Sequence, residues 1–226
     1  MRPIRGVIFD VDGTLVDSND AHARAWEEAF RAAGHPVPFA NIRPLIGMGG
    51  DKLVPAVTGW RRDDPRIEEI RKRRGEIFRT RYLPGVGAFP GASELVAALK
   101  RSGLELAVAS SAEKEELEPL LARAGAAELI QHKASSDDAH RSKPDPDIVQ
   151  SALSRLGRPR SEVVMIGDTP YDVEAAGRAG IAAVAFRSGG WDDAALEGAR
   201  EVYDGPADLL AHLPESMLAR ARTATV

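Results

Sequence analysis

Two aspartates stand two residues apart where the first apolar run of the chain ends in a glycine turn. Asp10 and Asp12 belong to the segment FDVDGT at residues 9–14. The apolar, partly β-branched run at residues 4–9 is typical of a buried strand. Ligands of open α/β sheets bind beyond the carboxyl ends of the strands, so this segment predicts a polar site there. A turn that merely caps the strand is the structural alternative.

A pair of serines and a lysine give two further polar signals. Ser110 and Ser111 follow the apolar run LAVA and open a predicted helix, so that hydroxyl and backbone N–H groups face one edge. Helix capping is the alternative role for them. Lys143 lies in SKPDP, where Pro144 fixes the turn and limits where the ammonium group can point. The alternative for this residue is an ordinary solvated loop lysine.

The last signal is a second acidic strand end. Asp168 and Asp172 lie in GDTPYD at residues 167–172, directly after another β-branched, apolar run. Either acid could instead be a helix-start residue favoured by the helix dipole.

Together these segments predict one anion-binding and metal-binding centre. Two acidic strand ends would bring Asp10, Asp12 and Asp168 around one point, where carboxylates repel one another unless a cation neutralises them. Mg²⁺ suits such oxygen ligands, whereas Zn²⁺ would favour histidine or cysteine. Lys143 and Ser110 would then bind phosphoryl oxygens from the opposite side.

The elements that must position these residues alternate along the chain. Strands are predicted at 4–9, 104–110, near 129, at 163–168, at 182–186 and near 202. Helices are predicted at 19–33, 63–82, 91–102, 112–124, 145–156, 171–179 and 207–212. Such alternation is typical of an α/β fold with a doubly wound, mainly parallel, Rossmann-like sheet.

An all-helical insertion is expected after the first strand, because no strand pattern occurs between residues 17 and 85. We therefore expect a catalytic core formed by residues 1–16 and 86–226, and a helical cap domain formed by residues 17–85. An insertion at that point would overhang the strand ends as a lid. The linkers at 16–17 and 84–91 are candidate hinges, and residues 214–226 are expected to be a frayed tail.

Composition narrows the function classes. The 226 residues are 43% hydrophobic and carry a net charge of −4, which favours a large globular core and gives no basic face for nucleic acid. The chain has no cysteine, which excludes disulfides and thiolate ligands and fits a reducing compartment. No membrane span or signal peptide is expected, so the expected location is cytoplasmic.

The four polar segments, in this order and spacing, resemble those of the haloacid dehalogenase superfamily. The similarity covers nearly the whole chain and is greatest to the helical-cap subgroup, which includes phosphoglycolate phosphatase and β-phosphoglucomutase. The matching residues are Asp10 and Asp12 for the first motif, Ser110 for the second, Lys143 for the third, and Asp168 with Asp172 for the fourth.

The resemblance implies a mechanism. Asp10 would attack phosphorus to form an aspartyl-phosphate, and Asp12 would first protonate the leaving alcohol and then deprotonate the incoming water. The carboxylates of Asp10 and Asp168, with the main-chain carbonyl of Asp12, would hold Mg²⁺, while Asp172 would support this arrangement. The presence of Asp12 argues against dehalogenation, because displacing halide from carbon needs no proton donor.

Three functions follow as hypotheses. The first is a Mg²⁺-dependent phosphatase for a small phosphorylated metabolite, similar to phosphoglycolate phosphatase and working as a monomer or weak homodimer. The second is a sugar phosphomutase similar to β-phosphoglucomutase, which is suggested by His22. The third is a non-enzymatic protein that binds a phosphorylated ligand. Candidate substrate-binding residues are Ser111, His22, Arg43 and Lys52, and the glycines at 47–50 form either a closing loop or a helix–helix turn.

Overall fold

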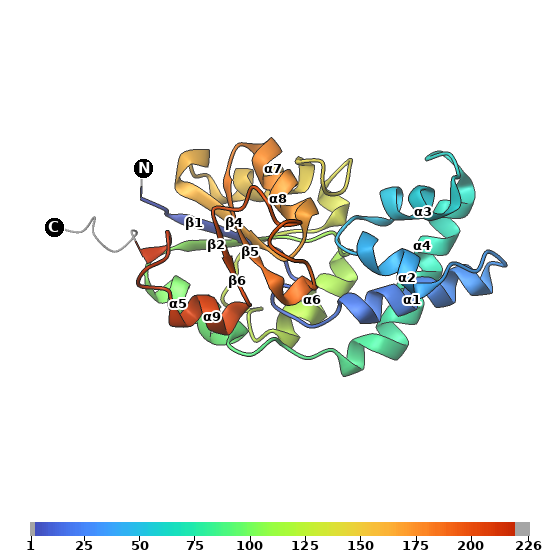
Figure 1. Ribbon diagram of the computed structural model, residues 1–226, viewed down its shortest axis with the longest axis horizontal. Helices are drawn as coiled ribbons and strands as arrows, with labels where there is room; N and C mark the ends of the chain where they lie inside the picture. Colours follow the sequence, from blue (N-terminus) through green and yellow to red (C-terminus); the bar gives the residue numbers. More distant parts are fainter. Residues whose placement is uncertain (1–2, 220–226) are drawn as a thin grey trace.

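Six parallel strands form one sheet in the computed structural model, which describes residues 3–219 (Figure 1). Their order across the sheet is β3-β2-β1-β4-β5-β6, and every neighbouring pair is parallel. The strands are β1 (Gly6–Phe9), β2 (Glu105–Ala109), β3 (His132–Ala134), β4 (Val163–Gly167), β5 (Ala182–Phe186) and β6 (Glu201–Tyr203). The doubly wound α/β fold predicted from the alternating pattern is thus confirmed.

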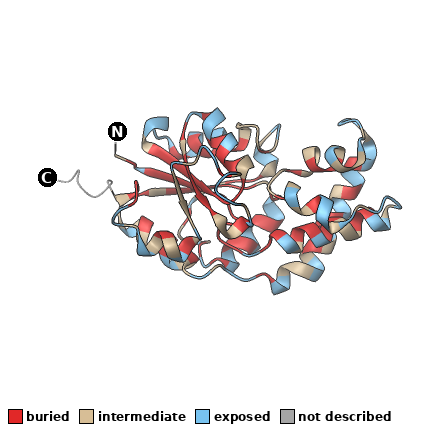
Figure 2. Ribbon diagram, viewed as in Figure 1, coloured by how far each residue is buried: buried red, intermediate tan, exposed pale blue. Residues whose placement is uncertain are grey.

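Helices cover both faces of this sheet. One face packs against α5 (Ala92–Arg101), α6 (Lys114–Arg123) and α9 (Pro206–Ala211). The opposite face packs against α7 (Asp147–Leu156) and α8 (Pro170–Ala179). Because both faces are covered, the central strands are buried along their whole length (Figure 2). None of the helices within residues 3–219 has the length and hydropathy needed to cross a membrane.

The segment between β1 and α5 is helical and has its own apolar cluster. It contains α1 (Asn19–Ala32), α2 (Phe39–Ile42), α3 (Gly50–Thr58), α4 (Pro65–Ile77) and a π-helical turn at Phe78–Tyr82. Apolar residues of α1 recur at helical spacing and meet those of α4, so that Trp26, Phe30, Ile67 and Ile70 are buried together. This unit lies at one end of the sheet (Figure 1).

Two chain segments connect the helical unit to the sheet, and they run side by side. The Asp17 N–H donates to the Gly87 carbonyl at 2.9 Å, and the Phe89 N–H donates to the Leu15 carbonyl at 3.0 Å. These bonds pair the outgoing linker with the returning one. The division into a core of 1–16 and 86–226 and a cap of 17–85 remains a prediction.

Two local expectations were wrong. The strand expected near residue 129 lies at His132–Ala134, because Leu129 and Ile130 form a turn whose N–H groups donate to the Ala126 carbonyl. The expected frayed tail is partly packed: Met217 and Leu218 are buried in the core beside α5 and α9. Their apolar side chains lose water contact there, which outweighs the cost of ordering the chain. Residues 220–226 lie outside the described residues.

Candidate active site

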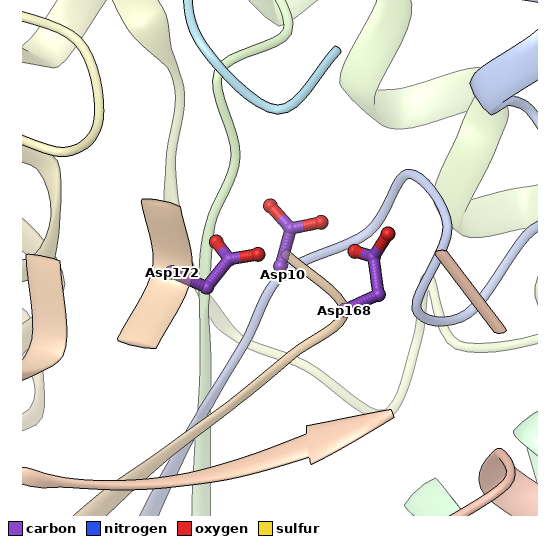
Figure 3. Close-up of side chains that lie close together, drawn as sticks. All are labelled: Asp10, Asp168 and Asp172. Carbon is purple, nitrogen blue, oxygen red and sulfur yellow. The ribbon is translucent and has the colours of Figure 1, made fainter. Parts of the chain in front are cut away.

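Three carboxylates gather at the carboxyl edge of the sheet (Figure 3). Asp10 follows β1 and Asp168 follows β4, and these strands are neighbours with Phe9 opposite Ile166. The next residues therefore emerge at one edge, as parallel pairing requires. Asp172, in the first turn of α8, completes the group, with one oxygen of each side chain within 4.8 Å of the others.

Lys143 lies among these acids. Its side chain is buried, and its ammonium group forms ion pairs with Asp10 and, at 2.8 Å, with Asp172. Burial opposes the charged ammonium, but the carboxylates of Asp10 and Asp172 outweigh burial and raise the pKa of Lys143. Lys143 is therefore not the solvated loop lysine that was the alternative reading of this residue.

The acidic side chains in this group outnumber the basic ones. Burial, together with the carboxylate of Asp172, raises the pKa of Asp168 to about 7. Burial also raises the pKa of Asp10 well above its usual value; Lys143 opposes this shift, and the other carboxylates add to it. Three buried carboxylates around one ammonium leave uncompensated negative charge. An all-oxygen donor set with excess negative charge fits a divalent cation such as Mg²⁺.

Asp168 is held in place by two side-chain donors. The Thr14 hydroxyl donates to one carboxylate oxygen and the Asn19 amide to the other, both at 2.9 Å. Gly13 lies directly against this acid: a Cβ on Gly13 would stand 2.1 Å from Asp168 Oδ2, and its φ is +77°. Thr14 and Asn19 were not predicted as site residues, although Thr14 belongs to the first motif and Asn19 is the first residue of α1, the next helix along the chain.

The side chain of Asp12 has partners of its own outside this group of acids. It accepts a hydrogen bond from Ser18 Oγ at 2.5 Å and lies 2.8 Å from His22 Nε2. Burial alone would raise the pKa of Asp12, but His22, Ser18 and the more distant Arg74 together lower it. The group of three acids thus contains Asp172 in place of the Asp12 side chain.

A buried chain of polar contacts continues from Asp12 across the helical unit. The His22 ring stacks on Phe78 with centroids 3.8 Å apart, and its Nδ1 lies 3.5 Å from an Arg74 nitrogen. Arg74, on α4, donates to Glu116, on α6, at 2.8 and 3.0 Å. Arg74 and Glu116 were not predicted, because both stand in charge-rich stretches that resemble solvated helix faces.

Asp172 combines its place in the acidic group with a capping role. Its Oδ2 accepts from the Thr169 N–H at 3.1 Å and from the Thr169 hydroxyl at 2.7 Å, while the Asp172 N–H donates to that hydroxyl at 3.2 Å. This reciprocal capping box begins α8 and fixes the carboxylate. The helix-start reading of Asp172 was therefore correct, and the same bonds leave Oδ1 facing Lys143.

The two serines after β2 have different surroundings. Ser110 is buried, and its hydroxyl accepts the Ala112 N–H at 3.1 Å; it is not the N-cap of α6, which begins at Lys114. The hydroxyl of Ser111 donates to the Gly47 carbonyl at 3.1 Å. Ser111 lines a cavity that also reaches Asp10, Asp12 and His22.

The glycine-rich loop at 47–50 closes this cavity. Gly47 has a φ of +107°, and a Cβ there would stand 2.9 Å from Thr169 of the core. A Cβ on Gly49 would stand 2.5 Å from Ser142. The loop is thus more than a turn between helices, because its backbone lies directly on the core and lines the cavity wall.

Two predicted substrate-binding residues lie outside the lining of this cavity. Arg43 donates to Asp20 at 2.6 Å and to the Gly189 carbonyl at 2.9 Å. Lys52 donates to the Ser142 carbonyl at 2.6 Å and to Asp145 at 2.7 Å. Both side chains join the helical unit to the core. The structure brings only Ser111 and His22 of this predicted set to the cavity.

Comparison with known proteins supports the resemblance to the haloacid dehalogenase superfamily over nearly the full length of the chain. The family model described as haloacid dehalogenase-like hydrolase matches residues 7–186. An N-acetylmuramic acid 6-phosphate phosphatase of Pseudomonas aeruginosa is 32% identical, with 92% of this chain and 93% of that protein covered. A phosphoglycolate phosphatase of Rhodospirillum rubrum is 32% identical, with coverage of 91% and 89%.

A solved structure shows the same relationship in three dimensions. A hydrolase from Pseudomonas syringae superposes with a TM-score of 0.87 at 32% identity, covering 93% of this chain and 98% of that one. The similarity therefore extends over both the sheet and the helical insertion. The chain belongs to the haloacid dehalogenase-like hydrolase family.

Proposed function

We propose that this chain is a Mg²⁺-dependent phosphatase that hydrolyses a small phosphomonoester through an aspartyl-phosphate intermediate on Asp10. The observation that carries the proposal is the separation of two acids from one motif. Asp10 lies against Lys143 in the acidic group, whereas Asp12 is turned toward His22. These different surroundings support one carboxylate as the nucleophile that attacks phosphorus and the other as the group that transfers protons.

In the first step an oxygen of Asp10 attacks phosphorus and the bond from phosphorus to the alcohol oxygen breaks. The leaving alkoxide takes the proton shared by Asp12 and His22, whose nearest atoms are 2.8 Å apart. Lys143 offsets charge on the transferring phosphoryl group, because its ammonium already lies beside Asp10. Among residues 3–219 the Ser110 hydroxyl accepts the Ala112 N–H and donates to no acceptor, so its O–H can donate to a phosphoryl oxygen.

In the second step a water molecule attacks the phosphorus of the aspartyl-phosphate. Asp12 accepts the water proton, the bond from phosphorus to the Asp10 oxygen breaks, and inorganic phosphate leaves. Asp12 and His22 again hold one proton, and Asp10 is again a carboxylate. The lowered pKa of Asp12 keeps its side chain in the carboxylate form, which is the form that can accept the water proton.

Mg²⁺ fits this site as the resident cation. The carboxylates of Asp10 and Asp168 and the main-chain carbonyl of Asp12 would hold it, with Asp172 and its capping box supporting the arrangement. When bound, Mg²⁺ neutralises charge on the phosphoryl oxygens. The excess of buried carboxylates over cations in this group supports the assignment.

A phosphomutase is the second candidate, and the His22–Asp12 contact favours it. A mutase would return the phosphoryl group to a second hydroxyl of the same sugar, so it would retain a bisphosphate instead of releasing phosphate. Incubation with β-glucose 1-phosphate distinguishes the two. Conversion to glucose 6-phosphate with little inorganic phosphate would support the mutase, whereas stoichiometric phosphate release would exclude it as the main activity.

Phosphate release from a panel of phosphorylated metabolites tests the main proposal. With Mg²⁺ the wild type is expected to hydrolyse at least one member, and Asp10→Asn is expected to lose ~10³-fold or more, because the nucleophile is removed. Circular dichroism of both proteins controls for folding. Equal activity of the two proteins, or no release by the wild type from any member, would refute the proposal.

A further inference from the structure

The carboxylate of Asp168 is held by residues from two separate elements. The Thr14 hydroxyl, from the turn after β1, donates to Oδ1, and the amide of Asn19, the first residue of α1, donates to Oδ2. All three side chains are buried. A carboxylate with a donor on each oxygen cannot rotate without breaking one of these bonds. Asn19 thereby ties the orientation of Asp168 to the first helix of the helical unit.

Two glycines lie against the same oxygen that Asn19 holds. A Cβ on Gly13 would stand 2.1 Å from Asp168 Oδ2, and a Cβ on Gly189 would stand 2.3 Å from it. Neither position has Oδ1 among its three nearest atoms. The main chain at both glycines therefore occupies space beside Oδ2, which leaves more room around Oδ1.

The residue type at position 19 also has electrostatic consequences. The first turn of a helix favours acids, because the helix dipole stabilises negative charge there. An acid at position 19 would stand at hydrogen-bond distance from the buried carboxylate of Asp168, and two like charges would repel. The Asn19 amide is a neutral donor instead. It can orient Asp168 without cancelling the negative charge that attracts a cation.

We propose that Asn19 is a positioning residue for the cation, because it fixes Asp168 as a ligand through Oδ1 alone and thereby favours Mg²⁺ over the larger Ca²⁺. The assignment rests on the proposed Mg²⁺-dependent function. Mg²⁺ demands nearly ideal octahedral geometry, whereas Ca²⁺ accepts more oxygens in looser geometry, including carboxylates that bind through both oxygens. A carboxylate that is free to rotate can bind in this second way, and one held at Oδ2 cannot.

Calorimetric titration with MgCl₂ and with CaCl₂, in the absence of substrate, tests this role. Asn19→Ala is expected to raise the Kd for Mg²⁺ ~10-fold or more and the Kd for Ca²⁺ less than ~3-fold, because only Mg²⁺ depends on the fixed orientation. Asn41→Ala, at the other asparagine of the chain, is the matched control, because Asn41 is exposed on α2. It should leave both Kd values unchanged.

Asn19→Ser tests the same contact with a second variant. Serine keeps a polar residue in the first turn of α1, but its side chain is too short to place a donor where the amide lies. Circular dichroism checks the folding of both variants. An unchanged Kd for Mg²⁺ in a folded variant, or an equal rise in Kd for both cations, would overturn the assignment. Absence of Mg²⁺ binding by the wild type would instead refute the metal dependence in the proposed function.

Discussion

At the residue scale, Asp12 differs from Asp10 by its partners. Asp10 is surrounded by Lys143 and other carboxylates, whereas Asp12 is bonded to Ser18 and His22. Two chemically identical side chains thereby acquire opposite pKa shifts, upward for Asp10 and downward for Asp12. The contacts, rather than the pKa shifts, support separate roles: Asp10 lies beside the ammonium group of Lys143, and Asp12 lies beside a histidine with which it can share a proton.

The proton role of Asp12 predicts a dependence on the leaving group. Asp12→Asn is expected to lower kcat/KM for an alkyl phosphate by ~10²–10⁴-fold, because the alkoxide then leaves without a proton. For p-nitrophenyl phosphate the loss should be under ~10-fold, since p-nitrophenolate leaves readily unprotonated. Steady-state kinetics of the wild type and Asp12→Asn on both substrates give the two ratios of kcat/KM. An equal loss on the two would mean that Asp12 is not the acid.

The close approach of Gly13 to Asp168 predicts a second residue effect. Gly13→Ala is expected to destabilise the fold and disrupt Asp168, because its Cβ would stand 2.1 Å from that carboxylate and 2.2 Å from the Asn19 amide. Gly34→Ala is the matched control, since Gly34 has a φ of +76° with no atom within 4 Å of a Cβ. Gly34→Ala should cost ~1–2 kcal/mol from backbone strain alone. Urea unfolding measures the free energy of unfolding of both variants. Equal decreases in the two variants would contradict the steric argument.

At the element scale, the pair Arg74–Glu116 joins helix α4 of the insertion to helix α6 of the core. The Glu116 side chain is fully buried and that of Arg74 is 9% exposed. Since taking either charge from water is costly, each depends on the other for compensation. The pair thus holds the two units together beside the cavity that both of them line.

Removing one charge of this pair has a predicted cost. Glu116→Gln is expected to lower the free energy of unfolding by about 3 kcal/mol, because Arg74 is left buried without its counter-ion. Glu118→Gln, on the same helix, breaks a pair with Lys133 in which Glu118 is 50% exposed, and it should cost less than ~1 kcal/mol. Denaturant unfolding of both variants makes the comparison. Similar costs for both would show that the buried pair contributes no more than a surface pair.

At the scale of the whole molecule, the order of the strands brings Asp10 and Asp168 together at one edge of the sheet. The strands β1 and β4 are central neighbours in a parallel sheet, so Asp10 and Asp168 meet although they stand far apart in the sequence. The helical insertion leaves the sheet at the same edge and returns by a linker bonded to the outgoing one. The helical insertion is thereby tied close to the group of three acids.

Cation binding to the assembled site predicts a global effect on stability. Because a ligand of the folded state stabilises it by mass action, Mg²⁺ at ~100 times its Kd should add about 2.7 kcal/mol and raise Tm by several degrees. Asp168→Asn should abolish this increase. Asp137→Asn, at an exposed acid on the core, should retain it. Thermal melts at increasing Mg²⁺ make the measurement, and an identical rise in Asp168→Asn would place the cation elsewhere.

Much of this molecule was predictable because its signals are local. Apolar periodicity gave β5 at its observed bounds and most helices within two residues. The strand β3 was misplaced because Leu129 and Ile130 are apolar, the first partly buried and the second buried, but both lie in a turn, and apolar character alone does not distinguish a turn from a strand. The packing of Met217 and Leu218 was missed because a short apolar segment has no partner visible in sequence.

The sequence by itself determined the alternating α/β order, the helical insertion and the acids, serine and lysine at the strand ends, since each depends on residues close together in the chain. Only the tertiary structure decided that Asp12 contacts His22, that Arg74 pairs with Glu116, and that Asn19 donates to Asp168. Such contacts depend on how separate elements pack, and a charged or hydroxyl side chain looks the same in sequence whether it is solvated or buried.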